Sequence, residues 1–188
     1  MDAGLAGVLG ATVGAVGTGG AAVVAALLAR SQARFQLTAE HRKSLREPRR
    51  AAYVAYASAL RETYELFVKA KYLAEDAHAS TDRREELRAE ALREYQEATQ
   101  RQAAMEHDAA VIHVEGPREV TRASVGASSK LQKFRSAVLD YMSAATELDA
   151  DHRFALLEEK EAEAHTGYLE FLYAASDALD ADLLALGE

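Results

Sequence analysis

From about residue 49 onward, apolar side chains recur at intervals of three and four residues, which is the spacing of one face of an α-helix. The first run begins at Pro48, whose restricted φ suits the first turn of a helix, and it fades near His78. Its expected apolar face contains Tyr53, Tyr56, Ala57, Leu60, Tyr64, Phe67 and Val68. The pattern predicts one long amphipathic helix.

Three more helices follow from the same rhythm. Residues 80–82 (Ser-Thr-Asp) can cap the second helix, and Gly116-Pro117 ends it and starts the third. The third helix is expected to continue to about Leu148, with Gly126 inside it as a close contact or a kink. Residues 149–151 form a weak break before the fourth helix.

Four helices of about 30–35 residues joined by short turns favour an antiparallel up-and-down bundle over residues 48–188. The β-branched patch at residues 111–114 is too isolated to build a sheet. The predicted fold class is therefore all-α, with an N-terminal transmembrane helix followed by a long antiparallel four-helix bundle.

The transmembrane part of this prediction concerns residues 1–29, where positions 3–29 carry no charge. At about 1.5 Å per residue, a helix of that length exceeds the ~30 Å hydrocarbon core of a bilayer. A cleavable signal peptide would have a basic start and a short apolar region, and both features are missing. A buried soluble helix would need a large apolar partner surface. An uncleaved membrane span is the favoured interpretation.

Small residues are spaced three and four apart within this span and would form one stripe of the helix. In lipid, such stripes allow two helix backbones to approach closely. Self-association through the stripe is one expectation, and an Ala/Gly-rich span without a partner is the alternative. The stripe consists of Gly7, Gly10, Gly14, Gly17 and Ala21.

Charge is unevenly placed along the chain. Residues 30–50 have a net charge of +5 and residues 140–188 a net charge of −11, within a total of −8. Residues 30–47 are predicted to form a basic juxtamembrane segment that meets anionic lipid, which places the bundle in the cytoplasm below the cell inner membrane and the N-terminus outside. The candidate headgroup contacts are Arg30, Arg34, Arg42, Lys43, Arg46, Arg49 and Arg50.

The acidic C-terminal region is either a solvated face or a docking surface for a basic partner. An acidic chain also argues against general nucleic-acid binding, which needs a basic face. The expected docking face consists of Glu158, Glu159, Glu161, Glu163, Glu170 and Asp177.

Candidate chemistry is sparse. The chain has no cysteine, so a thiol nucleophile and a Cys-ligated metal are excluded, and no Walker, GxSxG or HExxH motif occurs. Gly17–Ala22 fits the pattern GxGxxA, but no strands surround it to build a dinucleotide site. Three acid–histidine pairs have helical spacing, namely Glu75 with His78, Asp149 with His152 and Glu161 with His165. We interpret them as solvated surface groups, and we expect no cofactor, metal or catalytic residue.

The chain resembles a group of uncharacterised small single-pass membrane-anchored helical proteins of actinobacteria, Streptomyces in particular. The resemblance rests on the Gly/Ala span leading into LLARSQARFQLTAEHRKSLREPRRAAYVAYASAL, the Gly116-Pro117 break and the aromatic last helix. Its most specific part is residues 46–53, and the use of 16 Arg against 6 Lys agrees with a GC-rich genome. The resemblance implies an origin and a location, and no chemistry.

These observations predict a membrane-anchored helical scaffold or adaptor that binds a partner protein in the cytoplasm. The alternative is an oligomerising membrane effector whose Gly-rich span perturbs the bilayer. A metal-dependent enzyme is the third and least favoured hypothesis.

Overall fold

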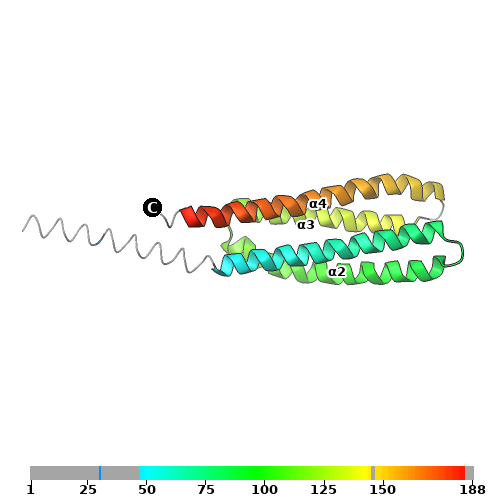
Figure 1. Ribbon diagram of the computed structural model, residues 1–188, viewed down its shortest axis with the longest axis horizontal. Coiled ribbons are helices and arrows are strands. Elements are labelled where there is room, and N and C mark those ends of the chain that lie inside the picture. The colour runs from blue at the N-terminus through cyan, green and yellow to red at the C-terminus, as the bar shows by residue number, and fades with distance from the viewer. Residues whose placement is uncertain (1–29, 31–46, 145–146, 185–188) are drawn as a thin grey trace, which may run out of the picture. The chain divides into compact units, whose positions relative to one another are not determined.

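The computed structural model describes residues 30, 47–144 and 147–184. This part of the chain contains long helices and no strand, which confirms the all-α prediction. The first helix covers residues 47–79 and is called helix 47–79 below. It is followed by α2 (Arg84–Glu115), α3 (Arg118–Met142) and α4 (Glu147–Leu184). These four helices pack together within one compact unit, Arg46–Glu188 (Figure 1).

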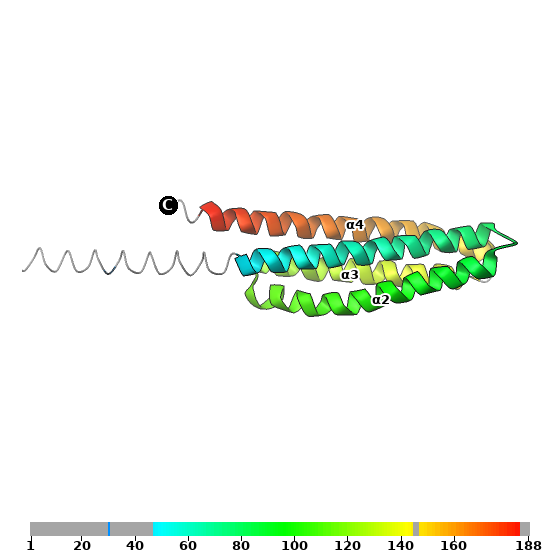
Figure 2. The same ribbon diagram turned by 60° about the horizontal axis from the view of Figure 1, so that its bottom comes forward.

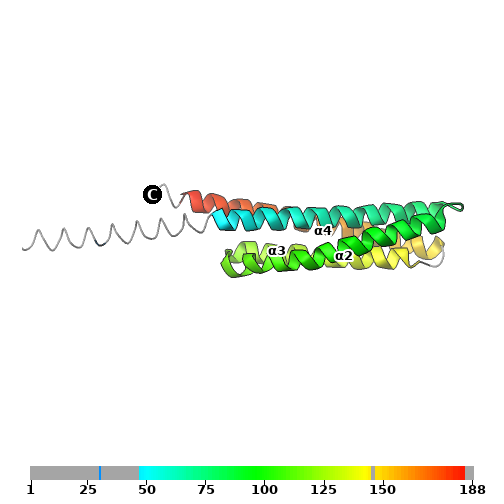
Figure 3. The ribbon, with the colours of Figure 1, turned by 90° about the horizontal axis from the view of Figure 1, so that it is seen from below.

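Successive helices run in opposite directions, as three views of the bundle agree (Figures 1, 2 and 3). Lys69 pairs with Glu94, whereas Glu62, earlier in helix 47–79, pairs with Arg101, later in α2. These two helices are therefore antiparallel. One end of the bundle therefore holds residue 47, the α2–α3 turn and the end of α4. The other end holds the two remaining turns.

The predicted transmembrane helix and its glycine stripe lie outside the described residues, as does most of the predicted basic segment. Arg30 is described as an exposed helical residue, and Arg50 is exposed in the first turn of helix 47–79. Arg49, beside it, is half-buried. Within 47–144 and 147–184, no helix has both the length and the apolar character needed to cross a bilayer.

Two of the three turns fall where the sequence places them. Gly116-Pro117 separates α2 from α3, and the Gly116 amide donates to the Ile112 carbonyl at 2.9 Å. The second turn holds Ser80, whose hydroxyl accepts from the Arg83 amide at 3.1 Å. Residues 80–82 do not cap α2 as predicted, because its N-cap residue is Arg83 and no side chain caps the helix there. The third prediction was wrong, because α3 ends at Met142 and residues 149–151 continue α4. Ala150 packs into the core there, so the helix gains burial at the predicted break.

The core follows an alternating three–four spacing through all four helices, as in a coiled coil. In helix 47–79, the buried positions with this spacing are Tyr53, Tyr56, Leu60, Thr63, Phe67, Ala70, Ala74 and Ala77. In α3 they are Val120, Ser124, Ala127, Leu131, Phe134, Val138 and Tyr141. One seam of side chains therefore runs from end to end of the bundle.

A tyrosine hydroxyl ties helix 47–79 to α3 across this core. Tyr56 donates to the carbonyl of Ser124 at 2.9 Å or shares a hydrogen bond with the Ser128 hydroxyl at 2.8 Å. Its ring packs edge-on against Phe171 at 4.7 Å between centroids. Burial raises the pKa of Tyr56 above its ordinary value. The hydroxyl is thus held inside the bundle as a neutral donor.

The close contact that the sequence suggested at Gly126 occurs instead at Gly167. A Cβ on Gly126 would meet nothing within 4 Å, whereas one on Gly167 would lie 3.2 Å from Ala127 Cα and 2.8 Å from Lys130 Cδ. Gly167 therefore lets α4 approach α3 closely. The contact between α3 and α2 is less extensive.

Candidate functional site

A lysine lies inside the bundle near the end that carries the turn between helix 47–79 and α2. The Lys71 side chain is 4% exposed. Its Nζ lies 2.6 Å from Glu158 Oε1, 2.6 Å from Glu161 Oε2 and 3.5 Å from Glu75 Oε1. One ammonium thus faces three carboxylates, which leaves the cluster with an excess of negative charge when all are ionised.

Glu161 takes part in this cluster because it occupies a core position of α4. It continues the three–four series between Leu157 and Ala164, and its side chain is 19% exposed. The sequence placed Glu161 in solvent beside His165, and that interpretation was wrong. Lys71 reaches across from helix 47–79 to neutralise Glu161, and the Tyr64 hydroxyl donates to its Oε1 at 3.4 Å.

The cluster shifts the protonation of its members. Burial alone would lower the pKa of Lys71, but its hydrogen bonds to Glu158 and Glu161 raise that pKa above the ordinary value. Burial raises the pKa of Glu75, and Lys71 offsets part of that rise. Burial, with the negative charge of Glu161, raises the pKa of Tyr64 to about 12. Lys71 is therefore held charged and Tyr64 neutral at physiological pH.

Aromatic rings connect this cluster to the end of the bundle. The Lys71 ammonium lies 5.3 Å from the centroid of Phe154 and 5.4 Å from that of Tyr72, close enough for cation–π attraction. Phe154 packs on Tyr141 at 5.9 Å, and Tyr141 packs on His78 at 5.0 Å. His78 in turn lines a cavity.

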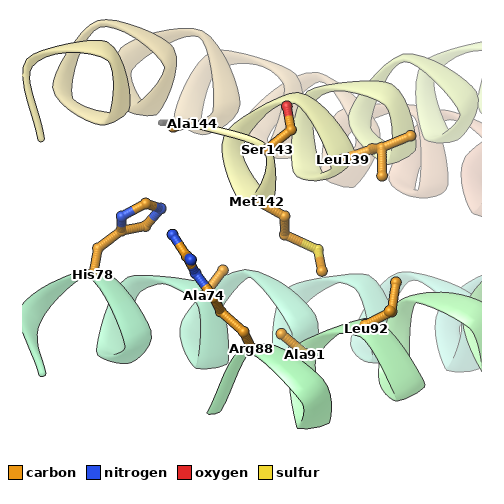
Figure 4. A pocket seen from close by; sticks show the side chains of 9 residues that line it. All are labelled: Ala74, His78, Arg88, Ala91, Leu92, Leu139, Met142, Ser143 and Ala144. Atoms are coloured by element: carbon orange, nitrogen blue, oxygen red, sulfur yellow. The ribbon is translucent and has the colours of Figure 1, made fainter. Parts of the chain in front are cut away.

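That cavity, of about 460 Å³, opens between helix 47–79, α2 and α3. Figure 4 shows two nitrogen-bearing side chains in its wall, with the guanidinium of Arg88 reaching toward the ring of His78. The rest of the wall is mainly apolar. The larger apolar side chains that line it are Leu92, Leu139 and Met142.

Arg88 lines the cavity from a half-buried position of α2, directly after the core residue Leu87. Leu87 and Ala91 are 7% and 0% exposed and continue the buried face of the helix. Arg88 therefore lies at the edge of the core. Within the described part of the chain, neither a carboxylate nor another hydrogen-bond acceptor pairs with the Arg88 guanidinium.

The predicted acidic face of α4 does not form one bare surface, because lysines contact five of its six acids. Lys71 binds Glu158 and Glu161, Lys160 binds Glu159 and Glu163, and Lys130 binds Glu170. Asp177 is exposed, and it has no ion pair among the described residues. The side chains of Glu158, Glu159 and Glu170 remain 55%, 60% and 57% exposed.

The acid–histidine pairs of the sequence do not converge on a common point. Glu75 faces Lys71, Asp149 binds Arg153, and the His165 ring packs near Tyr64. Among the described residues, no three His, Asp or Glu side chains are arranged to hold a metal ion.

Neither family models, nor curated proteins, nor solved structures gave a match to this chain. The sequence did not identify the two cations of the site, Lys71 and Arg88, as functional residues. Arg88 directly follows the core residue Leu87, and an arginine beside a core position usually extends into solvent. Lys71 flanks the core position of Ala70, where a lysine usually extends into solvent, so its own spacing gave no warning.

Proposed function

We propose that the protein is a membrane-anchored helical scaffold or adaptor whose bundle binds a partner protein on the cytoplasmic side. The observation that carries this proposal is the surface of α4. The helix has eleven acidic and two basic side chains. Several of its carboxylates stay more than half exposed although lysines contact them. Such a surface complements a basic partner and repels acidic ones.

The packing of the bundle supports a scaffold. Its described helices α2, α3 and α4 contain 32, 25 and 38 residues. At ~1.5 Å per residue, helices of this size make a rod of about 40–55 Å. Because one seam of buried side chains runs along it, the rod holds its two ends at a constant separation.

The order of the helices gives the bundle two distinct ends. Residue 47 lies at the end of the bundle that holds the α2–α3 turn, so any preceding segment enters there. The Lys71 cluster and the cavity lie toward the opposite end. The bundle therefore has one end at which the chain enters it and an opposite end that carries the Lys71 cluster and the cavity.

The docking proposal is tested by in-cell cross-linking and a pull-down of the full chain from mild detergent. Asp177→Lys reverses an exposed charge on α4 that has no ion pair among the described residues. Glu106→Lys makes the same change on α2 and serves as the control. We expect Asp177→Lys alone to reduce recovery of the partner. Failure to recover any partner, or equal effects of the two variants, would contradict the proposal.

The anchor is tested by ultracentrifugation of broken cells. The full chain should sediment with membranes, resist extraction by high salt and dissolve in detergent. Replacing Gly10 and Gly14 by Leu should abolish cross-linked oligomers without releasing the chain from the membrane fraction. A chain that stays in the supernatant without detergent would disprove the anchor. The docking proposal would not be affected by that result.

A further inference from the structure

We propose that the cavity between helix 47–79, α2 and α3 binds a small amphiphilic anion, namely an aliphatic monocarboxylate. Its headgroup would bind the guanidinium of Arg88, with the ring of His78 as a second nitrogen partner. Its aliphatic chain would lie against Leu92, Leu139 and Met142. This inference does not depend on the proposed scaffold function.

Arg88 is the group that would bind the anionic headgroup. A guanidinium presents a planar set of N–H donors that matches the two oxygens of a carboxylate. Arg88 is half-buried and lines the cavity, yet the described residues offer it neither a carboxylate nor another acceptor. The carboxylates of the neighbouring cluster are bound to Lys71 instead. One unpaired positive charge at the wall selects a ligand with one negative charge.

The rest of the cavity wall suits an aliphatic chain. A volume of about 460 Å³ falls in the range of ~300–1,000 Å³ that is typical of small-molecule sites. Leu92 and Leu139 line the cavity and are 44% and 45% exposed. An alkyl chain in the cavity would cover both leucines and remove apolar surface from water.

The methionines of the chain provide a specific readout. The sequence has three, of which Met142 lines the cavity and Met105 is fully buried in the core. In full-length protein labelled with ¹³C at the methionine methyl groups, the Met142 signal reports on the cavity. The Met105 signal serves as an internal reference. Sodium decanoate, 1-decanol and decyltrimethylammonium share a chain length and differ in headgroup charge, so they are the three probes.

We expect decanoate to shift the Met142 methyl signal saturably and to leave Met105 in place. Decanol and the ammonium should bind at least tenfold more weakly, because neither pairs with a guanidinium. Octanoate should bind about sixteenfold more weakly than decanoate, since it lacks two methylenes and each buried methylene contributes about fourfold. This comparison separates binding in the cavity from simple ion pairing at the surface.

Substitutions on α2 complete the test. Arg88→Gln should weaken decanoate binding at least tenfold, Arg88→Lys should retain part of it, and Arg93→Gln should leave it unchanged. Arg93 is the matched control because it is an exposed arginine of the same helix that also has no ion pair among the described residues. The proposal is overturned if no probe shifts Met142 saturably, if decanol or the ammonium matches decanoate, or if Arg88→Gln binds like the wild type.

Discussion

The ammonium of Lys71 lies 2.6 Å from Glu161 Oε2, and this pair joins helix 47–79 to α4 at the core of the bundle. Each partner is largely removed from water, so each needs the other to avoid an uncompensated buried charge. Glu158 accepts a second hydrogen bond from the same ammonium, and Glu75 lies beside it. The ion pairs of the Lys71 cluster therefore help to fix the register of helix 47–79 against α4.

Removal of Lys71 should strongly destabilise the bundle. Lys71→Met leaves three carboxylates close together without a cation, and we expect the free energy of unfolding at neutral pH to fall by about 3–5 kcal/mol. Lowering the pH to about 5 should restore part of this loss, because the unpaired carboxylates take up protons. Urea unfolding of the full chain at both pH values measures the effect.

A second substitution separates charge from packing at this position. Adding Glu161→Leu to Lys71→Met fills the core position with an apolar side chain and should recover part of the stability. A Lys71→Met variant as stable as the wild type, or one whose loss is the same at both pH values, would show that the cluster does not hold the helices together.

The alkaline limit of stability should depend on Tyr64. Its pKa is about 12 in the folded protein, above the ordinary value of 10.0. The contribution of Tyr64 to the free energy of unfolding is therefore complete below pH ~10. It is lost as the pH rises toward the pKa of Tyr64 in the folded protein, because Tyr64 ionises at lower pH in the unfolded chain. The raised pKa of Lys71 acts in the same direction. In Tyr64→Phe, the fall in unfolding free energy above pH ~10 should be shallower, by up to about 1.4 kcal/mol per pH unit.

Urea unfolding of the wild type and of Tyr64→Phe, at a series of alkaline pH values, measures the two slopes. Identical slopes would mean that Tyr64 ionises equally readily in the folded and unfolded chain.

Gly126 in α3 and Gly167 in α4 should respond oppositely to a larger side chain. Gly126→Ala adds a methyl group where nothing lies within 4 Å, so it should raise stability by about 0.5–1 kcal/mol through helix propensity. Gly167→Leu adds bulk against Ala127 and Lys130 and should lower stability by about 1–3 kcal/mol. Thermal unfolding of both variants gives the comparison. Loss of stability in Gly126→Ala would argue for a contact at that face.

We expect Arg88 to lower the stability of the folded protein. Arg88→Leu places an apolar side chain at a half-buried position of α2 in a mainly apolar cavity wall, and we expect the free energy of unfolding to increase by about 1–2 kcal/mol. Arg93→Leu, at an exposed position of the same helix, should change it by less than about 0.5 kcal/mol. Urea unfolding of both variants provides the check. Destabilisation by Arg88→Leu would mean that the arginine has a structural partner.

The sequence by itself determined the elements of this protein. Helices follow from the spacing of apolar side chains along one segment, and Gly116-Pro117 ends a helix through its own backbone restrictions. Both signals are local, so the all-α class and the turn between α2 and α3 were predicted correctly. The predicted span at residues 1–29 stays a prediction of the same kind.

The tertiary structure decided which charges lie inside. Glu161 and Asp177 belong to the same acidic helix, yet one is bound to Lys71 in the core and the other is exposed. Gly126 and Gly167 likewise differ in what faces them. The cavity beside Arg88 also exists only where three helices meet. Whether a side chain is buried, paired or left facing a cavity depends on the surface that another helix brings to it, and the spacing within its own helix does not contain that surface.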